Sequence, residues 1–93
     1  MRKRARTDAN HAEIREALRR DGWYVLDTSS LGGGFPDLVA AKGGSVHLIE
    51  VKDGSKPLSA QALTSAEAKV SADLLSRGVV VKLIRNVDEA MAL

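Results

Sequence analysis

The sequence contains no cysteine, two prolines, two histidines and a single residue each of Trp, Tyr and Phe among its 93 positions. Without cysteine, the chain can form no disulfide framework, no thiolate nucleophile and no cysteine-bound zinc site. Any metal ion that the chain binds must therefore be held by Asp, Glu or His side chains.

Long apolar segments are also missing. No run approaches the roughly 20 residues that a helix needs to span a bilayer. The basic N-terminus is followed by Asp8, Asn10 and Glu13 rather than by an apolar signal core. We expect a soluble, cytoplasmic protein with no membrane partner. The glycines at 32–34 lack the following Gly-Lys-Ser/Thr of a phosphate-binding loop, so no nucleotide cofactor is expected.

The charge of the chain is unevenly distributed. The formal net charge is +2, and four of the fourteen basic residues lie at its start, which leaves ten basic against twelve acidic groups over 7–93. We expect a basic arm over 1–6 and a single domain over 7–93. The arm either contacts nucleic-acid phosphates through counterion release or is a solvated tail. Its basic residues are Arg2, Lys3, Arg4 and Arg6.

The hydrophobic pattern predicts alternating helices and strands. Ile14, Ala17 and Leu18 have helical spacing, and Thr64 with Glu67 forms a capping-box pattern ahead of a second helix. A nearly continuous apolar run at 79–84 indicates a buried strand. The predicted helices are 7–20, 65–77 and one beginning near 87, and the predicted strands are 23–26, 36–41, 46–52 and 79–84.

The order of these elements is αβββαβα, with a hairpin signal at 42–45 and a turn-rich segment at 53–62. Such an order favours an α/β fold, with helices that flank a mixed sheet. The strands 36–41 and 46–52 are expected to be antiparallel neighbours.

Three charged residues are expected to meet at the ends of these two strands. Glu50 and Lys52 are two apart and share a face of their strand, while Asp37 opens the neighbouring strand beside them. Two carboxylates so placed repel each other unless a cation lies between them, and hard oxygen ligands suit Mg²⁺ or Mn²⁺. The alternative is structural, with Asp37 in an ordinary turn and the other two in a surface ion pair.

These residues resemble a known family. Pro36-Asp37, a spacing of thirteen residues and then Glu50-Val51-Lys52 resemble the PD-(D/E)XK nuclease motif. The fuller run from Gly34 to Leu38 is similar to the VRR-NUC and Holliday-junction-resolvase-like branch, and the small size is similar to phage-type versions.

The resemblance implies a restriction-endonuclease-like αβββαβ core and a metal-dependent DNA endonuclease. It also implies a role in replication, repair or recombination, with branched or junction DNA as substrate. By the same resemblance Asp37 and Glu50 are metal ligands, the carbonyl of Val51 is a further ligand, and Lys52 is the catalytic lysine.

Further candidates come from the flanking segments. Glu13 is either a catalytic carboxylate on the leading helix, as the resemblance implies, or the partner of Asn10 in a capping box. Lys56 and Gln61 are candidate nucleic-acid contacts. For Glu67 we expect the capping role with Thr64 rather than a place in the site.

Two alternatives to an active nuclease follow from the same residues. One is a catalytically silent nucleic-acid-binding or assembly module of the same fold, and the other is a protein-interaction domain. A homodimer is expected in the nuclease interpretation, because the core of so short a chain is small and its sheet edges need a partner or cover.

Overall fold

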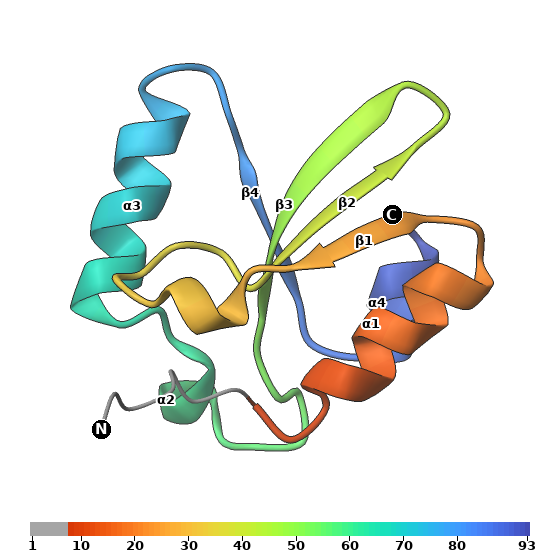
Figure 1. The fold of residues 1–93 in the computed structure, drawn as a ribbon. Helices are drawn as coiled ribbons and strands as arrows, with labels where there is room; N and C mark the ends of the chain where they lie inside the picture. The colour runs from red at the N-terminus through yellow and green to blue at the C-terminus, as the bar shows by residue number, and fades with distance from the viewer. Residues whose placement is uncertain (1–7) are drawn as a thin grey trace.

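The computed structural model describes residues 8–93, so the basic arm predicted over 1–6 lies outside the described residues. Figure 1 shows the helices α1 (His11–Arg20), α2 (Leu58–Gln61), α3 (Ser65–Leu75) and α4 (Val87–Met91), the short 3₁₀ helix η1 (Ser29–Leu31), and the strands β1 (Tyr24–Asp27), β2 (Leu38–Lys42), β3 (Ser45–Val51) and β4 (Val81–Ile84).

The four strands form one mixed sheet in the order β1-β2-β3-β4. The first three are antiparallel neighbours, and β4 runs parallel to β3. Gly43 and Gly44 connect β2 to β3 with φ angles of 59° and 84°, the two positive values that a two-residue hairpin turn of type I′ requires. The predicted α/β class and the restriction-endonuclease-like αβββαβ order are confirmed, and α2 is an additional element within 53–62.

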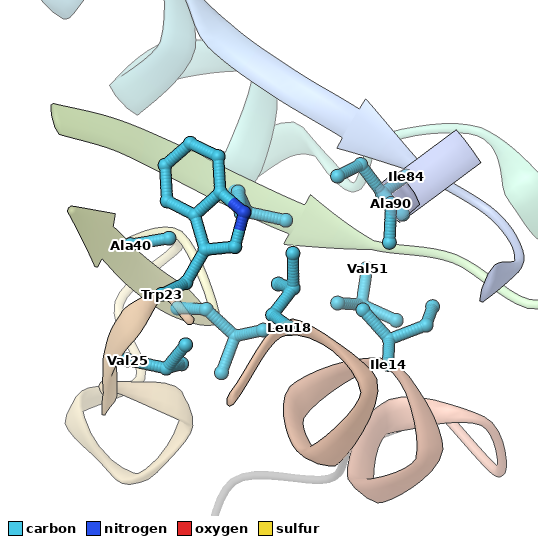
Figure 2. Packing of buried hydrophobic residues seen from close by; sticks show 10 residues of the cluster. Ile14, Leu18, Trp23, Val25, Ala40, Val51, Ile84 and Ala90 are labelled. Carbon is cyan, nitrogen blue, oxygen red and sulfur yellow. The ribbon is translucent and has the colours of Figure 1, made fainter. Parts of the chain in front are cut away.

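The helices lie on both sides of the sheet. α1 and α4 pack together on one face, and α3 lies on the other (Figure 1). The core fills the space between the sheet and the helices α1 and α4, where α1 presents Ile14 and Leu18 to strand residues such as Val51 (Figure 2). All three side chains are fully buried. The helical spacing read from the sequence therefore does identify the buried face of α1.

The opposite face of the sheet is largely uncovered. The register places Leu26, Val39 and Leu48 side by side on this face, and Tyr24 next to Ala41 in the adjacent row. Tyr24 is 66% exposed and Leu26 is 49% exposed. We call the apolar residues on this side the open face, which consists of Tyr24, Leu26, Val39, Ala41, Val46, Leu48, Val81 and Leu83.

The prediction of a buried strand at 79–84 is wrong in part. The strand begins at Val81, and Val80 before it is 59% exposed. β4 is an edge strand of the sheet, and α3 contributes no buried residue to cover it. A continuous apolar run marks a strand, but it does not ensure that both faces of the strand are covered.

α1 begins later than predicted, at His11, with Asn10 as its N-cap. The capping box between Asn10 and Glu13, one of the two alternatives for Glu13, is absent, since the Asn10 side chain makes no cap hydrogen bond. Its Nδ2 instead donates to the carbonyls of Lys52 at 3.2 Å and Arg85 at 2.7 Å. Asn10 thereby ties the start of α1 to the segments that follow β3 and β4.

A leucine-to-alanine substitution should change the free energy of unfolding by different amounts on the two sides of the sheet. Leu18→Ala removes a fully buried side chain and should lower the free energy of unfolding by about 2 to 5 kcal/mol. Leu75→Ala truncates a side chain of α3 that is 59% exposed and should change it by less than about 0.5 kcal/mol. Urea unfolding followed by circular dichroism measures both, and equal costs would contradict the assignment of the core to the α1 face.

Candidate active site

Asp37 is held at the start of β2 by contacts with the end of β3. Its backbone N–H donates to the carbonyl of Ile49 at 2.8 Å, and its Oδ2 accepts from the N–H of Val51 at 2.9 Å. The pairing of Leu38 with Ile49 puts Asp37 beside Glu50, the next residue of β3. The meeting of these residues that the sequence predicts is therefore present.

Glu50 and Lys52 are both buried although both are ionisable. Glu50 is 3% exposed and Lys52 is 7% exposed. The Lys52 Nζ donates to Oε1 of Glu67 at 2.8 Å, across the gap between the end of β3 and the first turn of α3. A surface ion pair of Glu50 with Lys52, the structural alternative, does not describe this arrangement, because Lys52 pairs with a different carboxylate and is buried.

A cleft of about 500 Å³ opens where these side chains meet. It lies between the ends of β2 and β3 and the start of α3, and residues 8 and 9 form another part of its wall. The charged residues that line it are Asp8, Asp37, Glu50, Lys52, Lys56 and Glu67. Four carboxylates thus face two ammonium groups in one partly open space.

The electrostatics of the cleft disfavour a charged Glu50. Burial of this carboxyl, followed by the proximity of Asp37 and Glu67, raises the pKa of Glu50 to about 10. Burial alone would lower the pKa of Lys52, but the Glu67 carboxylate raises it above its ordinary value. Lys52 is accordingly a cation in this setting, and Glu50 holds a proton until another positive charge enters the cleft.

The Pro36-Asp37 segment is held by hydrogen bonds from Thr28, the residue that follows β1. The Thr28 backbone N–H donates to the carbonyl of Asp37 at 2.8 Å, and the Thr28 hydroxyl donates to that of Pro36 at 2.6 Å. The preceding Asp27 accepts from Arg15 of α1 at 2.8 Å and bonds Nε2 of His11 at 3.0 Å. These contacts connect the buried side of α1 to the residue that enters the cleft.

Of the other residues that the sequence suggests for the site, Lys56 lies in this cleft and Glu13 and Gln61 do not. Lys56 lines it, but Glu13 is exposed and lines a neighbouring cavity with Asp53 and Arg85. Gln61 donates from Nε2 to the carbonyl of Lys56 at 2.6 Å and so stabilises the loop before α2. The geometry brings Lys56 to the site, and it gives no support to Glu13 or Gln61 as members.

Two residues that the sequence did not assign to the site line the cleft. Glu67 forms the predicted capping box with Thr64 and also binds Lys52, so its expected restriction to the capping role is wrong. Asp8 reaches the cleft from the segment before α1. The capping pattern predicts where α3 begins, but nothing in it shows which strand end the helix begins beside.

The donor set suits a hard divalent cation. Asp37 and Glu50 offer carboxylate oxygens from adjacent strand ends. The pKa of Glu50 is raised first by burial and then by the neighbouring carboxylates, and a cation beside Glu50 would oppose both effects. Within residues 8–93, no group of three or more His, Cys, Asp or Glu side chains is arranged to hold a metal ion. Asp37 and Glu50 are therefore a pair of candidate ligands rather than a complete side-chain metal site.

A mixed αβββαβ sheet that brings a Pro-Asp and a Glu-x-Lys from adjacent strands into one cleft defines the class of nucleases with a restriction-endonuclease-like core. Residues 2–72 match the family model of the archaeal Holliday junction resolvase (Hjc), and this chain belongs to that family. Membership identifies it as an endonuclease of the resolvase type, with DNA as its substrate class.

A comparison with curated proteins finds no match. The family match supports the resolvase half of the resemblance stated above, and the VRR-NUC and phage-type assignments receive no support from it. Among residues 8–93, no helix has the length and apolar character needed to cross a membrane.

The buried Glu50 predicts an unusual pH dependence of stability. The unfolded chain releases the Glu50 proton near pH 4.5, whereas the folded chain holds it up to about pH 10. Without metal, this group therefore lowers the free energy of unfolding progressively as the pH rises between these values. We expect Glu50→Gln to raise the urea midpoint in the presence of a chelator, with no gain at about pH 4 and a larger gain toward about pH 9.

The matched control for this prediction is Glu13→Gln, at an exposed position of α1. Its urea midpoint should follow that of the wild type at every pH. A Glu50→Gln protein that is no more stable than the wild type at high pH would show that Glu50 carries no electrostatic penalty.

Proposed function

We propose that this protein is a Mg²⁺- or Mn²⁺-dependent endonuclease that hydrolyses phosphodiester bonds at DNA junctions, in replication, repair or recombination. The observation that carries the proposal is the convergence of Asp37, Glu50 and Lys52 in one cleft. A DNA substrate also favours the cytoplasmic location expected from the sequence. The arm over 1–6 is proposed to contact DNA phosphates, and it lies outside the described residues.

Each residue of the cleft has a distinct task in this proposal. Asp37 and Glu50, with the carbonyl of Val51, are proposed to hold the divalent cation, which when bound supplies an activated water and charge neutralisation. Lys52 presents an ammonium group to the phosphoryl oxygens, where negative charge develops in the transition state. Lys56, at the outer part of the cleft, contacts a neighbouring phosphate.

The protonated state of Lys52 distinguishes two possible roles for this residue, as a base that removes a proton from water and as a positive charge beside the phosphoryl group. Because Glu67 keeps the ammonium form favoured, Lys52 is better suited to stabilise phosphoryl charge than to remove a proton from water. Hydrolysis then depends on Lys52 as a positive charge at a defined place rather than as a base.

We further propose that the protein acts as a homodimer through the open face. This face carries contiguous apolar side chains, among them Tyr24, Leu26 and Val46, which are 66%, 49% and 67% exposed. Exposed apolar patches of this kind are typical of interaction surfaces. Glu50 lies on the same side of the sheet as Leu48, two residues before it, so a symmetric contact here would bring two clefts into one assembly.

Removal of either carboxylate ligand tests the proposed chemistry. Asp37→Asn and Glu50→Gln should each abolish Mg²⁺-dependent cleavage of a four-way junction, because each removes an anionic oxygen ligand, and DNA binding should persist. Lys52→Ala should lower turnover by several orders of magnitude. The measurements are single-turnover cleavage of labelled junctions and a separate gel-shift assay with a chelator.

Two controls accompany these variants. Asp88→Asn changes an exposed carboxylate on α4 and should cleave at the wild-type rate. Glu13→Gln should also cleave normally, since Glu13 lies outside the cleft. Wild-type cleavage by Asp37→Asn would refute the metal assignment, and a wild type that binds junctions but never cuts them would favour the silent binding module.

The dimer has its own test in solution. Light scattering at micromolar concentration should give twice the chain mass of 9.9 kDa, and Leu26→Lys should halve it by placing a charge on the open face. Leu58→Lys changes an exposed leucine of α2 and should leave the mass unchanged. A wild-type mass near that of one chain, with and without DNA, would contradict the proposed dimer.

A further inference from the structure

α3 packs only lightly on the rest of the molecule. None of its residues is buried, and the strand that it chiefly contacts is the edge strand β4. Two contacts at its N-terminal end connect it to the active-site cleft. One is made by Gly34, from the loop before Asp37, and the other by Glu67.

The first contact is steric. Gly34 has a φ angle of +86° and lies against the first turn of α3. A Cβ atom at this position would overlap the carbonyl oxygen of Ala66 and lie 2.8 Å from the backbone nitrogen of Glu67. Gly33, with a φ angle of +65°, has nothing within 4 Å of the same atom. Only the absence of a side chain at Gly34 lets α3 begin this close to the loop.

The second contact is a shared hydrogen-bond acceptor. Oε1 of Glu67 accepts from the backbone N–H of Thr64 at 2.9 Å and from Nζ of Lys52 at 2.8 Å. The Glu67 and Lys52 side chains are 19% and 8% exposed, so the pair is largely removed from water. One oxygen atom therefore fixes both the helix cap and the position of the active-site ammonium group.

We propose that Glu67 is a positioning residue for Lys52, and that Gly34 sets its place by seating the first turn of α3 against the loop that leads to Asp37. This inference rests on the proposed nuclease function. A lysine side chain has four flexible carbons and many accessible rotamers, so its charge needs a fixed partner to stay in one place. Within residues 8–93, Glu67 is the only hydrogen-bond partner of the Lys52 ammonium.

Two substitutions of Glu67 test this role. Glu67→Ala removes the acceptor and should lower the single-turnover rate at saturating junction DNA about 100-fold, the effect of a misplacement near 1 Å. Glu67→Gln keeps an oxygen that can accept both hydrogen bonds and should recover the rate to within about 10-fold of the wild type. Junction affinity, measured separately with a chelator, should stay within about 3-fold for both variants, because the proposed contact of Lys52 is with charge that develops only in the transition state.

The glycine pair provides a test that changes neither charge nor ligand. Gly34→Ala should reproduce the rate loss of Glu67→Ala, since the new methyl group displaces the first turn of α3. Gly33→Ala imposes a similar left-handed backbone strain but meets open space, so its rate should remain within about 3-fold of the wild type. Equal rates for the two glycine variants would overturn the role of Gly34.

A glutamate of α4 separates positioning from simple helix capping. Glu89 occupies the corresponding third helical position of α4, where its N–H donates to Asn86 and its side chain pairs with Arg85. Glu89→Ala should lose stability much as Glu67→Ala does and still cleave within about 3-fold of the wild-type rate. A Glu67→Ala protein that folds and cleaves like Glu89→Ala would overturn the proposal.

Chemical acetylation of lysines, followed by peptide mass spectrometry, supplies a readout that needs no cleavage. In the wild type Lys52 should react more slowly than the exposed Lys56, and Glu67→Ala or Gly34→Ala should abolish this protection whereas Gly33→Ala should not. Unprotected Lys52 in the wild type overturns the positioning role by itself. A wild type that protects Lys52 but cuts no DNA refutes the nuclease proposal and leaves the Glu67 contact standing.

Discussion

The pairing of β2 with β3 determines where every side chain of the cleft lies. The hairpin at Gly43 and Gly44 sets the register, and this register brings the start of β2 against the end of β3. Asp37 then closes the pair with a side-chain bond to the Val51 N–H. A shift of one residue would move Glu50 and Lys52 to the buried face and replace them with Ile49 and Val51. The burial of these two apolar residues in the core therefore protects the register that the active site needs.

The two faces of the sheet divide stability and function between them. One face packs against α1 and α4 and contains the fully buried residues, including Ile14, Leu18 and Leu38. The other carries the open face, the cleft and the lightly attached α3. Asn10 connects the two sides, because it precedes α1 and its side chain donates to the carbonyl of Lys52. The well-packed half of the molecule thus holds the backbone of the site, while the exposed half is the one that meets DNA and a second chain in the proposed assembly.

The ionised form of Glu50 is unfavourable in the folded protein. A buried Glu50 beside Asp37 and Glu67 disfavours its own ionisation, and a cation would relieve that repulsion. In the proposed metal site, folding stability and cation affinity therefore oppose each other at Glu50, as is common where a site is prepared for a ligand. The Lys52 ammonium is also buried, but its contact with the Glu67 carboxylate offsets the cost of that burial. The two halves of the cleft therefore differ, because Lys52 has a partner of opposite charge and Glu50 lies beside two other carboxylates.

Local sequence patterns predict much of the secondary structure of this protein. The spacing of Ile14 and Leu18, the Gly43-Gly44 turn and the Thr64 capping box each depend on neighbouring residues, so they predict α1, the hairpin and α3 within a few positions. The Asp37, Glu50 and Lys52 set follows from the same hairpin, because strand pairing converts sequence spacing into proximity. Contacts between distant segments carry no such local signal. Four features depend on tertiary packing, because each is set by which surfaces meet in three dimensions rather than by the order of residues along one element. They are the contact of Gly34 with α3, the hydrogen bond of Lys52 to Glu67, the two hydrogen bonds of Asn10 and the exposure of Val80.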